Sequence, residues 1–285
     1  MANFILSAFA DEYSSNFNEQ LKVLNEQNIT YIELRNVDGK SVIDLTLEEA
    51  KEYKKKLDEH KIHVSAIGSP IGKSDITESI DFEINRLKHA IKLAKIFDTK
   101  NIRMFSFYNR NNVEFDKFEK EVFFRLEKLL DIAEKEDIRL CHENESEIYG
   151  DILERCLKLY KHFNGRLRCV FDMANYVVNK VDALEAYLKT RQYIEYFHVK
   201  DAFYDGAIVP SGKGEGHIVE IFALANKDFN HDVLVTIEPH LSIFGGLNKL
   251  SKLTLRNTYT FPSQQEAFLE GVRSTKECLK KAKEL

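Results

Sequence analysis

The chain alternates strand-like and helix-like segments eight times, which restricts the folds open to it. The strand-like segments lie at residues 4–9, 31–35, 63–68, 101–107, 139–143, 167–172, 194–199 and 232–238. Several are apolar on both faces, which is typical of parallel strands covered by helices. Eight such units form either a closed barrel or a wide doubly wound sheet. Because no GxGxxG sequence follows the first strand to mark a dinucleotide crevice, we predict an α/β fold, a (β/α)8 TIM barrel.

Five sequences that resemble capping boxes precede the helix-like segments. In each, the first side chain would accept hydrogen bonds from the helix amides and a Glu three residues later would reach back. They are Asn16-x-x-Glu19, Thr46-x-x-Glu49, Asp75-x-x-Glu78, Asp182-x-x-Glu185 and Ser263-x-x-Glu266. The third box predicts a helix over residues 77–97, with an apolar stripe of Ile80, Ile84, Leu87, Ile91, Leu93 and Ala94 facing the sheet.

The size and composition fit one large soluble domain over residues 1–285. Barrels of this kind reach about 250 residues or more, and no Pro/Gly-rich linker divides the chain. With 44% apolar and 31% charged residues, the chain can bury a large core. The four cysteines include no C-x-x-C pair, so we expect reduced thiols in the core.

Charge and hydropathy limit the partners that we expect. The net charge of -5 and the pI near 6.0 argue against a nucleic-acid or anionic-membrane partner, which basic surfaces bind. The start of the chain does not resemble a secretory signal, and no apolar run approaches the roughly 18 residues of a membrane span. We therefore expect a cytoplasmic protein with a small-molecule partner, and a homo-oligomer remains possible.

Four consecutive strands in the second half of the chain each end at a residue that can bind a metal. The ends read Leu140-Cys141-His142-Glu143, Val170-Phe171-Asp172, Tyr196-Phe197-His198 and Thr236-Ile237-Glu238. Side chains alternate along a strand, so each last residue shares its face with the residue two before it. If that face points into a barrel, the four ends meet at its carboxyl edge. Carboxylate oxygens with one imidazole suit one divalent ion of Mn, Zn, Mg or Co.

Three of these four residues, taken alone, also have an ordinary structural explanation. Glu143 could face solvent, Asp172 could cap a helix, and His198 could be a hydrogen-bonded core histidine. Glu238 ends an apolar run, and a buried carboxylate there needs a cation. The shared position of all four at strand ends favours the metal site.

A loop from Ala202 to His217 follows the predicted ligand His198. It contains Val209-Pro210-Ser211-Gly212-Lys213-Gly214-Glu215-Gly216, with three glycines around a lysine. The glycine amides could cradle an anion, although the spacing is not that of a P-loop. A flexible surface loop is the alternative.

Motifs along nearly the whole chain resemble the sugar phosphate isomerase/epimerase family with the xylose isomerase-like TIM barrel. Besides the four strand ends, the motifs are Ser7-Ala8-Phe9-Ala10-Asp11-Glu12, Tyr31-Ile32-Glu33-Leu34-Arg35, Ser69-Pro70-Ile71-Gly72-Lys73, Arg103-Met104-Phe105-Ser106-Phe107 and His198-Val199-Lys200-Asp201. The resemblance implies that Glu143, Asp172, His198 and Glu238 hold the metal. Ketose epimerases of that superfamily often have histidine three residues after the aspartate, where this chain has Asn175.

The resemblance also implies a reaction. The metal would chelate neighbouring carbonyl and hydroxyl oxygens of a sugar or sugar phosphate and stabilise an enediolate. Glu143 and Glu238 would flank the substrate as the catalytic acid/base pair, one removing the proton and the other returning it. The expected activity is that of a metal-dependent isomerase or epimerase.

Further charged residues are candidates for substrate binding, with solvated surface charge as the alternative. Lys73, Lys200 and Lys213 could bind a phosphate or carboxylate, and Glu33 and Arg35 could bind hydroxyls. Asn175 joins them because of its place after Asp172.

Three other functions compete with isomerisation. The same metal and base could expel a hydroxyl, as in the inosose and dehydroshikimate dehydratases. A DNA-repair nuclease like endonuclease IV needs several more histidines, and the fourth strand here ends in Phe105-Ser106-Phe107-Tyr108 without one. A non-catalytic barrel that binds a small molecule is the last alternative.

Overall fold

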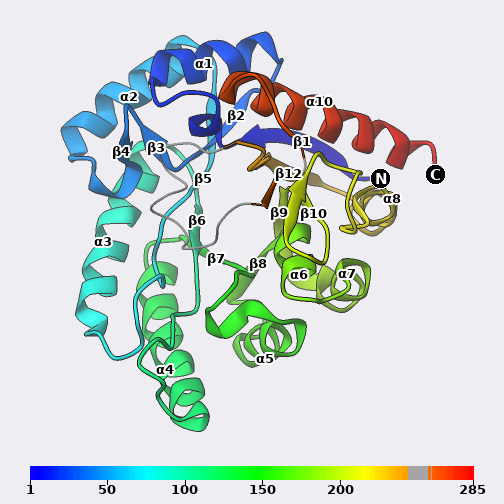
Figure 1. Cartoon of the computed structure of the whole chain (residues 1–285). Coiled ribbons are helices and arrows are strands. Elements are labelled where there is room, and N and C mark those ends of the chain that lie inside the picture. The colour runs from blue at the N-terminus through cyan, green and yellow to red at the C-terminus, as the bar shows by residue number, and fades with distance from the viewer. Residues whose placement is uncertain (243–255, 258) are drawn as a thin grey trace.

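A computed structural model of the protein, which describes residues 1–242, 256–257 and 259–285, contains eight parallel strands arranged as a barrel (Figure 1). The strands are β1 (Asn3–Ala8), β2 (Tyr31–Leu34), β5 (His63–Ile67), β6 (Asn101–Met104), β7 (Arg139–Glu143), β8 (Leu167–Asp172), β9 (Ile194–Val199) and β12 (Asp232–Ile237). Their order is β1-β12-β9-β8-β7-β6-β5-β2. The two end strands, β1 and β2, contact each other, so the barrel is nearly closed. The predicted (β/α)8 fold is confirmed.

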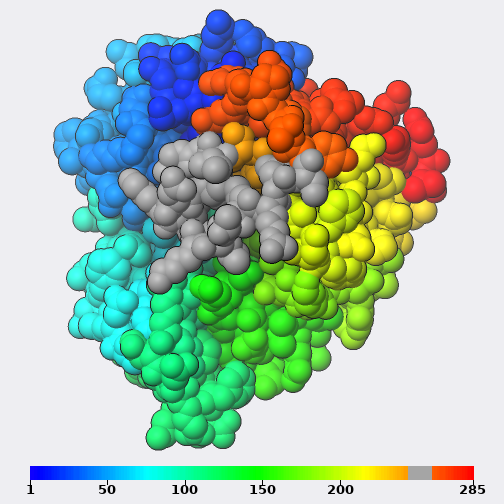
Figure 2. Space-filling view, in the orientation of Figure 1, coloured from blue at the N-terminus to red at the C-terminus, as the bar shows by residue number. Residues whose placement is uncertain are grey.

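Helices surround the strands on all sides in Figure 1. They are α1 (Phe17–Glu26), α2 (Leu47–Glu59), α3 (Ile80–Ile96), α4 (Phe115–Glu134), α5 (Leu153–Phe163), α6 (Met173–Val178), α7 (Ala183–Thr190), α8 (Ile218–Asp228) and α10 (Gln264–Lys283). The last helix lies beside the N-terminal segments, as the red and blue surfaces of Figure 2 show, and Lys276 Nζ donates to the carbonyl of Gln27 (2.6 Å). None of the helices in the described part of the chain has the length and apolarity needed to cross a bilayer.

Short elements join the strands and the main helices, most of them on the carboxyl side of the barrel, whereas the 3-10 turn that directly precedes β9 lies on the amino side. They are η1 (Ala10–Glu12), β3 (Asn36–Val37), β4 (Lys40–Ser41), η2 (Val42–Asp44), η3 (Tyr149–Asp151), η4 (Arg191–Tyr193), β10 (Asp201–Ala202), β11 (Ala207–Val209) and β13 (Arg256–Asn257). β10 pairs with β11, so the segment after β9 starts with a small antiparallel hairpin.

The N-caps predicted by the five sequences that resemble capping boxes are confirmed at four helices, one of them with the complete capping box, and the prediction at the fifth is wrong. Thr46 forms a complete capping box with Glu49, and the side chains of Asn16, Asp182 and Ser263 accept from the amide three residues on. α3 instead begins at Ile80, with Ser79 as its N-cap. Asp75 accepts from the Thr77 amide while Glu78 accepts from the Asp75 amide, so that sequence closes a turn before the helix.

A small apolar layer fills the barrel interior beneath the strand ends. Ala66, Cys141, Val170 and Tyr196 form a buried cluster separate from the large core between strands and helices. Three of these residues lie two positions before Glu143, Asp172 and His198, on the same face of their strands. All four cysteines of the chain are buried and free. The apolar layer therefore forms the floor of the carboxyl-end site.

The loops after β5 and β6 pair closely at the rim of this site. The amides of Phe105 and Phe107 donate to the carbonyls of Ile71 and Gly72 (2.8 Å each). Gly72 has φ +81°, and a Cβ at this position would lie 2.1 Å from the carbonyl oxygen of Phe105. The pairing therefore requires glycine at residue 72.

Gly72→Ala is expected to destabilise the protein by much more than Gly165→Ala. Gly165 has a similar φ of +86°, but a Cβ there would meet no atom of the described residues within 4 Å, so alanine costs only the left-handed conformation, about 1–2 kcal/mol. Alanine at residue 72 adds a clash with rigid backbone. Urea unfolding of both variants measures the difference. Equal losses would contradict the close approach of the two loops.

Candidate metal centre

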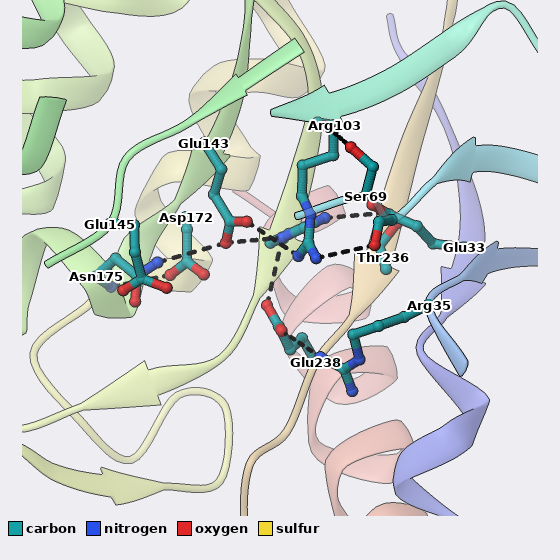
Figure 3. Close-up of polar contacts among 12 residues, drawn as sticks. Glu33, Arg35, Ser69, Arg103, Glu143, Glu145, Asp172, Asn175, Thr236 and Glu238 are labelled. Atoms are coloured by element: carbon teal, nitrogen blue, oxygen red, sulfur yellow. Dashed lines mark hydrogen bonds and ion pairs between the residues drawn. The ribbon is translucent and has the colours of Figure 1, made fainter. Parts of the chain in front are cut away.

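Four buried side chains converge at the carboxyl end of β7, β8, β9 and β12. Glu143, Asp172, His198 and Glu238 each offer one ligand atom, and these atoms all lie within 4.8 Å of one another. Asp172 pairs in register with His198, and His198 with Thr236, so the strand ends are level. Figure 3 shows the three carboxylates pointing toward a common centre. The structure thus brings together the four residues that the sequence singled out.

The imidazole of His198 connects the cluster to a fifth strand. Its Nδ1 lies 3.1 Å from Glu143 Oε1 and 3.3 Å from Glu238 Oε2, and its Nε2 lies 2.9 Å from Glu33 Oε2. Burial lowers the pKa of His198, but Glu33 and Glu143 outweigh it and hold the pKa well above its usual range. A carboxylate on the far nitrogen is the usual support of a metal-binding histidine, because it fixes the ring and its tautomer.

Glu33 is itself held in place by two hydroxyl groups from neighbouring strands. Tyr196 Oη donates to Glu33 Oε1 (3.2 Å), and Thr236 Oγ1 donates to Glu33 Oε2 (3.0 Å). Glu33 is 1% exposed. Its carboxylate therefore faces His198 inside the barrel.

Two buried arginines each bind one oxygen of a predicted catalytic glutamate. Arg103 Nη1 donates to Glu143 Oε2 (3.1 Å), and Arg35 Nη1 donates to Glu238 Oε1 (2.9 Å). Both guanidinium groups lie over the ring of Phe9, at 4.1 Å for Arg35 and 5.1 Å for Arg103. The other oxygen of each glutamate is left facing His198.

The pKa values of the three carboxylates are shifted in different directions. Burial raises the pKa of Glu143, but His198 and Arg103 outweigh it and lower the pKa to about 2. Burial also raises the pKa of Glu238, whereas Lys200 and His240 bring it well below its usual range. Burial raises the pKa of Asp172 to about 6, although Lys200 lowers it. Asp172 is therefore the carboxylate with the least compensated charge.

One oxygen of Asp172 has no hydrogen-bond partner among the described residues. Asp172 caps α6, and its Oδ1 accepts from the Asn175 amide (2.9 Å). Its Oδ2 is buried and accepts no hydrogen bond from this part of the chain, but it forms an ion pair with Lys200, whose Nζ lies 2.9 Å away. A buried carboxylate oxygen is normally paired or bound to a cation. Three carboxylates and an imidazole with such an oxygen among them fit a divalent cation.

Glu238 also belongs to a second cluster of possible metal-binding residues, next to the four-residue cluster described above. Glu12 and His240 lie with Glu238 within 4.8 Å, and His240 Nε2 is 3.3 Å from an oxygen of each glutamate. Arg35 also donates to Asp11 (2.9 Å) and Glu12 (3.2 Å). These partners of Glu238 were not predicted from the sequence, although Asp11 and Glu12 follow β1 directly.

The sequence prediction also missed Arg103. It stands in Asn101-Ile102-Arg103-Met104, where a charge within an apolar strand must find a partner inside the barrel. The same reasoning that selected Glu238 could have found it.

Three other residues predicted to bind substrate, Asn175, Lys73 and Lys213, have different surroundings. Asn175 Nδ2 lies 3.4 Å from Glu143 Oε1 and donates to the carbonyl of Asn144 (2.8 Å). Lys73 Nζ pairs with Glu145 Oε2 (3.1 Å) and lies 4.2 Å from the centroid of the Phe105 ring. Lys213 is exposed, and its charge acts on Glu277 and Cys278 of α10. The structure therefore places Asn175 beside the cluster and Lys213 outside it.

The backbone amides of the glycine-rich loop do bind an anionic group, but this group is the side-chain carboxylate of Asp201 in the same chain. The amides of Gly212 and Gly214 donate to Asp201 Oδ2 (2.8 and 2.9 Å), and the amide of Gly216 donates to Asp201 Oδ1 (2.9 Å). A Cβ at residue 214 would lie 2.4 Å from Asp201 Oδ1, so this arrangement needs glycine there. The loop is thus fixed to the residue that follows Lys200.

A comparison with protein families decides the classification. The family model of the xylose isomerase-like TIM barrel matches residues 21–248, which is most of the chain. The chain belongs to this family. Sequence comparison with curated proteins finds no significant match. The cluster of Glu143, Asp172, His198 and Glu238 lies within the matched residues.

Solved structures with the same fold include several kinds of protein. One described as L-ribulose 3-epimerase is 16% identical with a TM-score of 0.74, covering 100% of this chain and 96% of that one. The IOLI protein with a bound zinc atom is 17% identical with a TM-score of 0.73, covering 98% of both chains. The probable 3-DHS dehydratase AsbF from Bacillus anthracis is 14% identical with a TM-score of 0.71, covering 96% and 98%. At these identities the likeness concerns the fold.

Glu33→Gln is expected to weaken divalent-metal binding roughly 10- to 100-fold, because the amide no longer holds the imidazole of His198 with a negative charge. Calorimetric titration of the chelator-treated protein with Mn²⁺ measures this change. Glu195→Gln is the matched control, since Glu195 on β9 pairs with Arg139 and Arg168 away from the cluster. An unchanged dissociation constant in Glu33→Gln would contradict the supporting role of Glu33.

Proposed function

We propose that the protein is a divalent-metal-dependent isomerase or epimerase of a sugar or sugar phosphate. The observation that carries the proposal is the convergence of Glu143, Asp172, His198 and Glu238 within 4.8 Å at the carboxyl end of the barrel. Active sites of (β/α)8 enzymes lie at this end, where the loops can hold a substrate. The epimerase among the structural neighbours supports the same choice of reaction.

The four converging residues would hold one metal ion of Mn, Zn, Mg or Co. A bound divalent ion supplies Lewis acidity to the neighbouring carbonyl and hydroxyl oxygens of a polyol. A carbonyl polarised in this way makes the adjacent C–H more acidic. The protein then has to supply a base on that carbon and an acid to return the proton.

Glu143 and Glu238 are the proposed acid/base pair. Both are ionised at neutral pH, because nearby cations lower their pKa values. Each has one oxygen fixed by an arginine and the other turned toward the cluster. One glutamate would take the proton from the substrate carbon. The other, after first taking up a proton from solvent, would donate that proton to the opposite face or to the next carbon. Such positioned proton transfer contributes about 10²- to 10⁴-fold in rate.

The remaining site residues have separate proposed roles. Lys73, beside Phe105 and Glu145, is proposed to bind the distal end of the substrate, and Asn175 a hydroxyl near Glu143. Glu33 and Arg35 face the ligands His198 and Glu238, so the geometry favours orientation of those ligands over hydroxyl binding. Lys213 would reach a substrate phosphate only if the exposed side chain turned toward the barrel.

Dehydration is the alternative reaction, because it starts with the same proton removal. The dehydratase among the structural neighbours has the same fold. The two reactions differ in what happens to the neighbouring hydroxyl group. Exchange of a substrate hydrogen with solvent deuterium without loss of water supports isomerisation or epimerisation, whereas a product lighter by one water contradicts it.

Glu238→Gln is expected to lower turnover of the best substrate at least about 10²-fold, because the amide cannot accept or return a proton. A panel of ketoses and ketose phosphates, assayed with the Mn²⁺-loaded protein, identifies that substrate. A chelator should abolish the activity and added Mn²⁺ should restore it. Glu154→Gln, an exposed change on α5, serves as the control. Full activity in Glu238→Gln, or no activity on any member of the panel, would count against the proposed function.

A further inference from the structure

Lys200 places a positive charge inside the candidate metal centre. It directly follows β9, two residues after His198, and it is 5% exposed. Its Nζ lies 2.9 Å from Asp172 Oδ2 and 3.5 Å from Glu238 Oε2. The sequence suggests that this ammonium binds a phosphate or carboxylate of the substrate. In the structure it is directed at two of the four proposed metal ligands.

The partners of Lys200 distinguish it from the two buried arginines. Arg35 is compensated by Asp11 and Glu12 in addition to Glu238. Arg103 also donates to the carbonyl of Gly68 (3.3 Å). In the described part of the chain, both ion pairs of Lys200 go to proposed metal ligands. Metal binding would therefore affect every ion pair that Lys200 forms in this part of the chain.

The oxygen nearest to Lys200 is the one that most needs a cation. Asp172 Oδ2 accepts no hydrogen bond from the described residues, and Asp172 is fully buried. An isolated carboxylate is costly at such a depth, so the ammonium charge at 2.9 Å is its main compensation. A metal bound among the four ligands would meet this same oxygen.

We infer that Lys200 is an internal counter-ion that competes with the divalent metal for Asp172 and Glu238, and that metal binding displaces its ammonium group from them. The inference rests on the metal site of the proposed function. It assigns Lys200 a role in tuning metal affinity. The lysine stabilises the metal-free protein because its single positive charge compensates part of the charge of two buried carboxylates, and a metal has to overcome that interaction before it binds.

The charges explain why the exchange is possible. A divalent metal would carry two positive charges and would be held by all four residues, whereas the ammonium carries one charge and contacts two of them. Displacing the ammonium therefore costs part of the metal's binding energy without preventing binding. Removing the lysine charge should strengthen metal binding and weaken the metal-free fold.

Lys200→Met and Lys200→Gln test this inference on the full chain. Calorimetric titration of the chelator-treated proteins with Mn²⁺ at pH 8 should give a dissociation constant roughly tenfold or more below that of the wild type, because a like charge next to the metal is gone. The melting temperature of the metal-free variants should fall, and Mn²⁺ should raise it by more than in the wild type. Lys73→Met is the control, since Lys73 pairs with Glu145 outside the ligand set, and its affinity should match the wild type.

The outcomes separate this inference from the proposed metal site. If the wild type binds no Mn²⁺ with one-to-one stoichiometry, the metal site itself is wrong. If the wild type binds Mn²⁺ but both Lys200 variants bind it equally well or more weakly, only the counter-ion role is overturned. Should the variants fold only with Mn²⁺ present, that dependence supports the inference. Failure of both to fold even with Mn²⁺ overturns it, because the lysine would then be needed alongside the metal.

Discussion

The compensation of buried charge is the constraint on which this site depends. Glu143, Asp172 and Glu238 are nearly or fully buried above an apolar floor, where an unpaired carboxylate would cost more than most single interactions contribute. The barrel compensates these negative charges with cationic side chains that several strands direct into its carboxyl end. Arg103 comes from β6 and Lys200 from the end of β9, and each lies within 3.1 Å of a carboxylate oxygen. The fold thus places its charges in pairs before any ligand arrives.

These pairs also divide the site into fixed and adaptable parts. The arginines donate hydrogen bonds to the glutamates, and the ring of Phe9 lies against both guanidinium groups. The described residues hold the Asp172 carboxylate by a hydrogen bond to Oδ1, while its Oδ2 faces the Lys200 ammonium group. The geometry therefore combines two glutamates that arginines hold in place, the proposed acid/base pair, with oxygens of Asp172 and Glu238 whose ion-pair partner Lys200 can change. Such a division suits a centre that must bind a cation without moving its glutamates.

The sequence predicted the fold and the convergence of four strand-end side chains because both follow from local patterns. Strand alternation alone placed His198 and Asp172 on inward faces, and this was sufficient to bring them together. The same patterns could not show that Glu33, far away in the chain, binds the other nitrogen of His198, because the level of each inward residue depends on the stagger of the barrel. Asp75 misled the prediction for a local reason, since Thr77 offers a nearer amide than the helix does.

The loop around Asp201 limits how a substrate could be recognised at this rim. Its glycine amides resemble a phosphate cradle, yet a carboxylate from the chain already fills them. A phosphate could bind these amides only by displacing the Asp201 carboxylate. Because that carboxylate is part of the chain, its effective concentration at the amides is much higher than that of a free metabolite. Under the proposed function, a substrate phosphate would then have to be bound elsewhere, and Lys73 beside Phe105 is the cation proposed for it. A self-occupied cradle of this kind keeps the loop ordered whatever the cell's phosphate level.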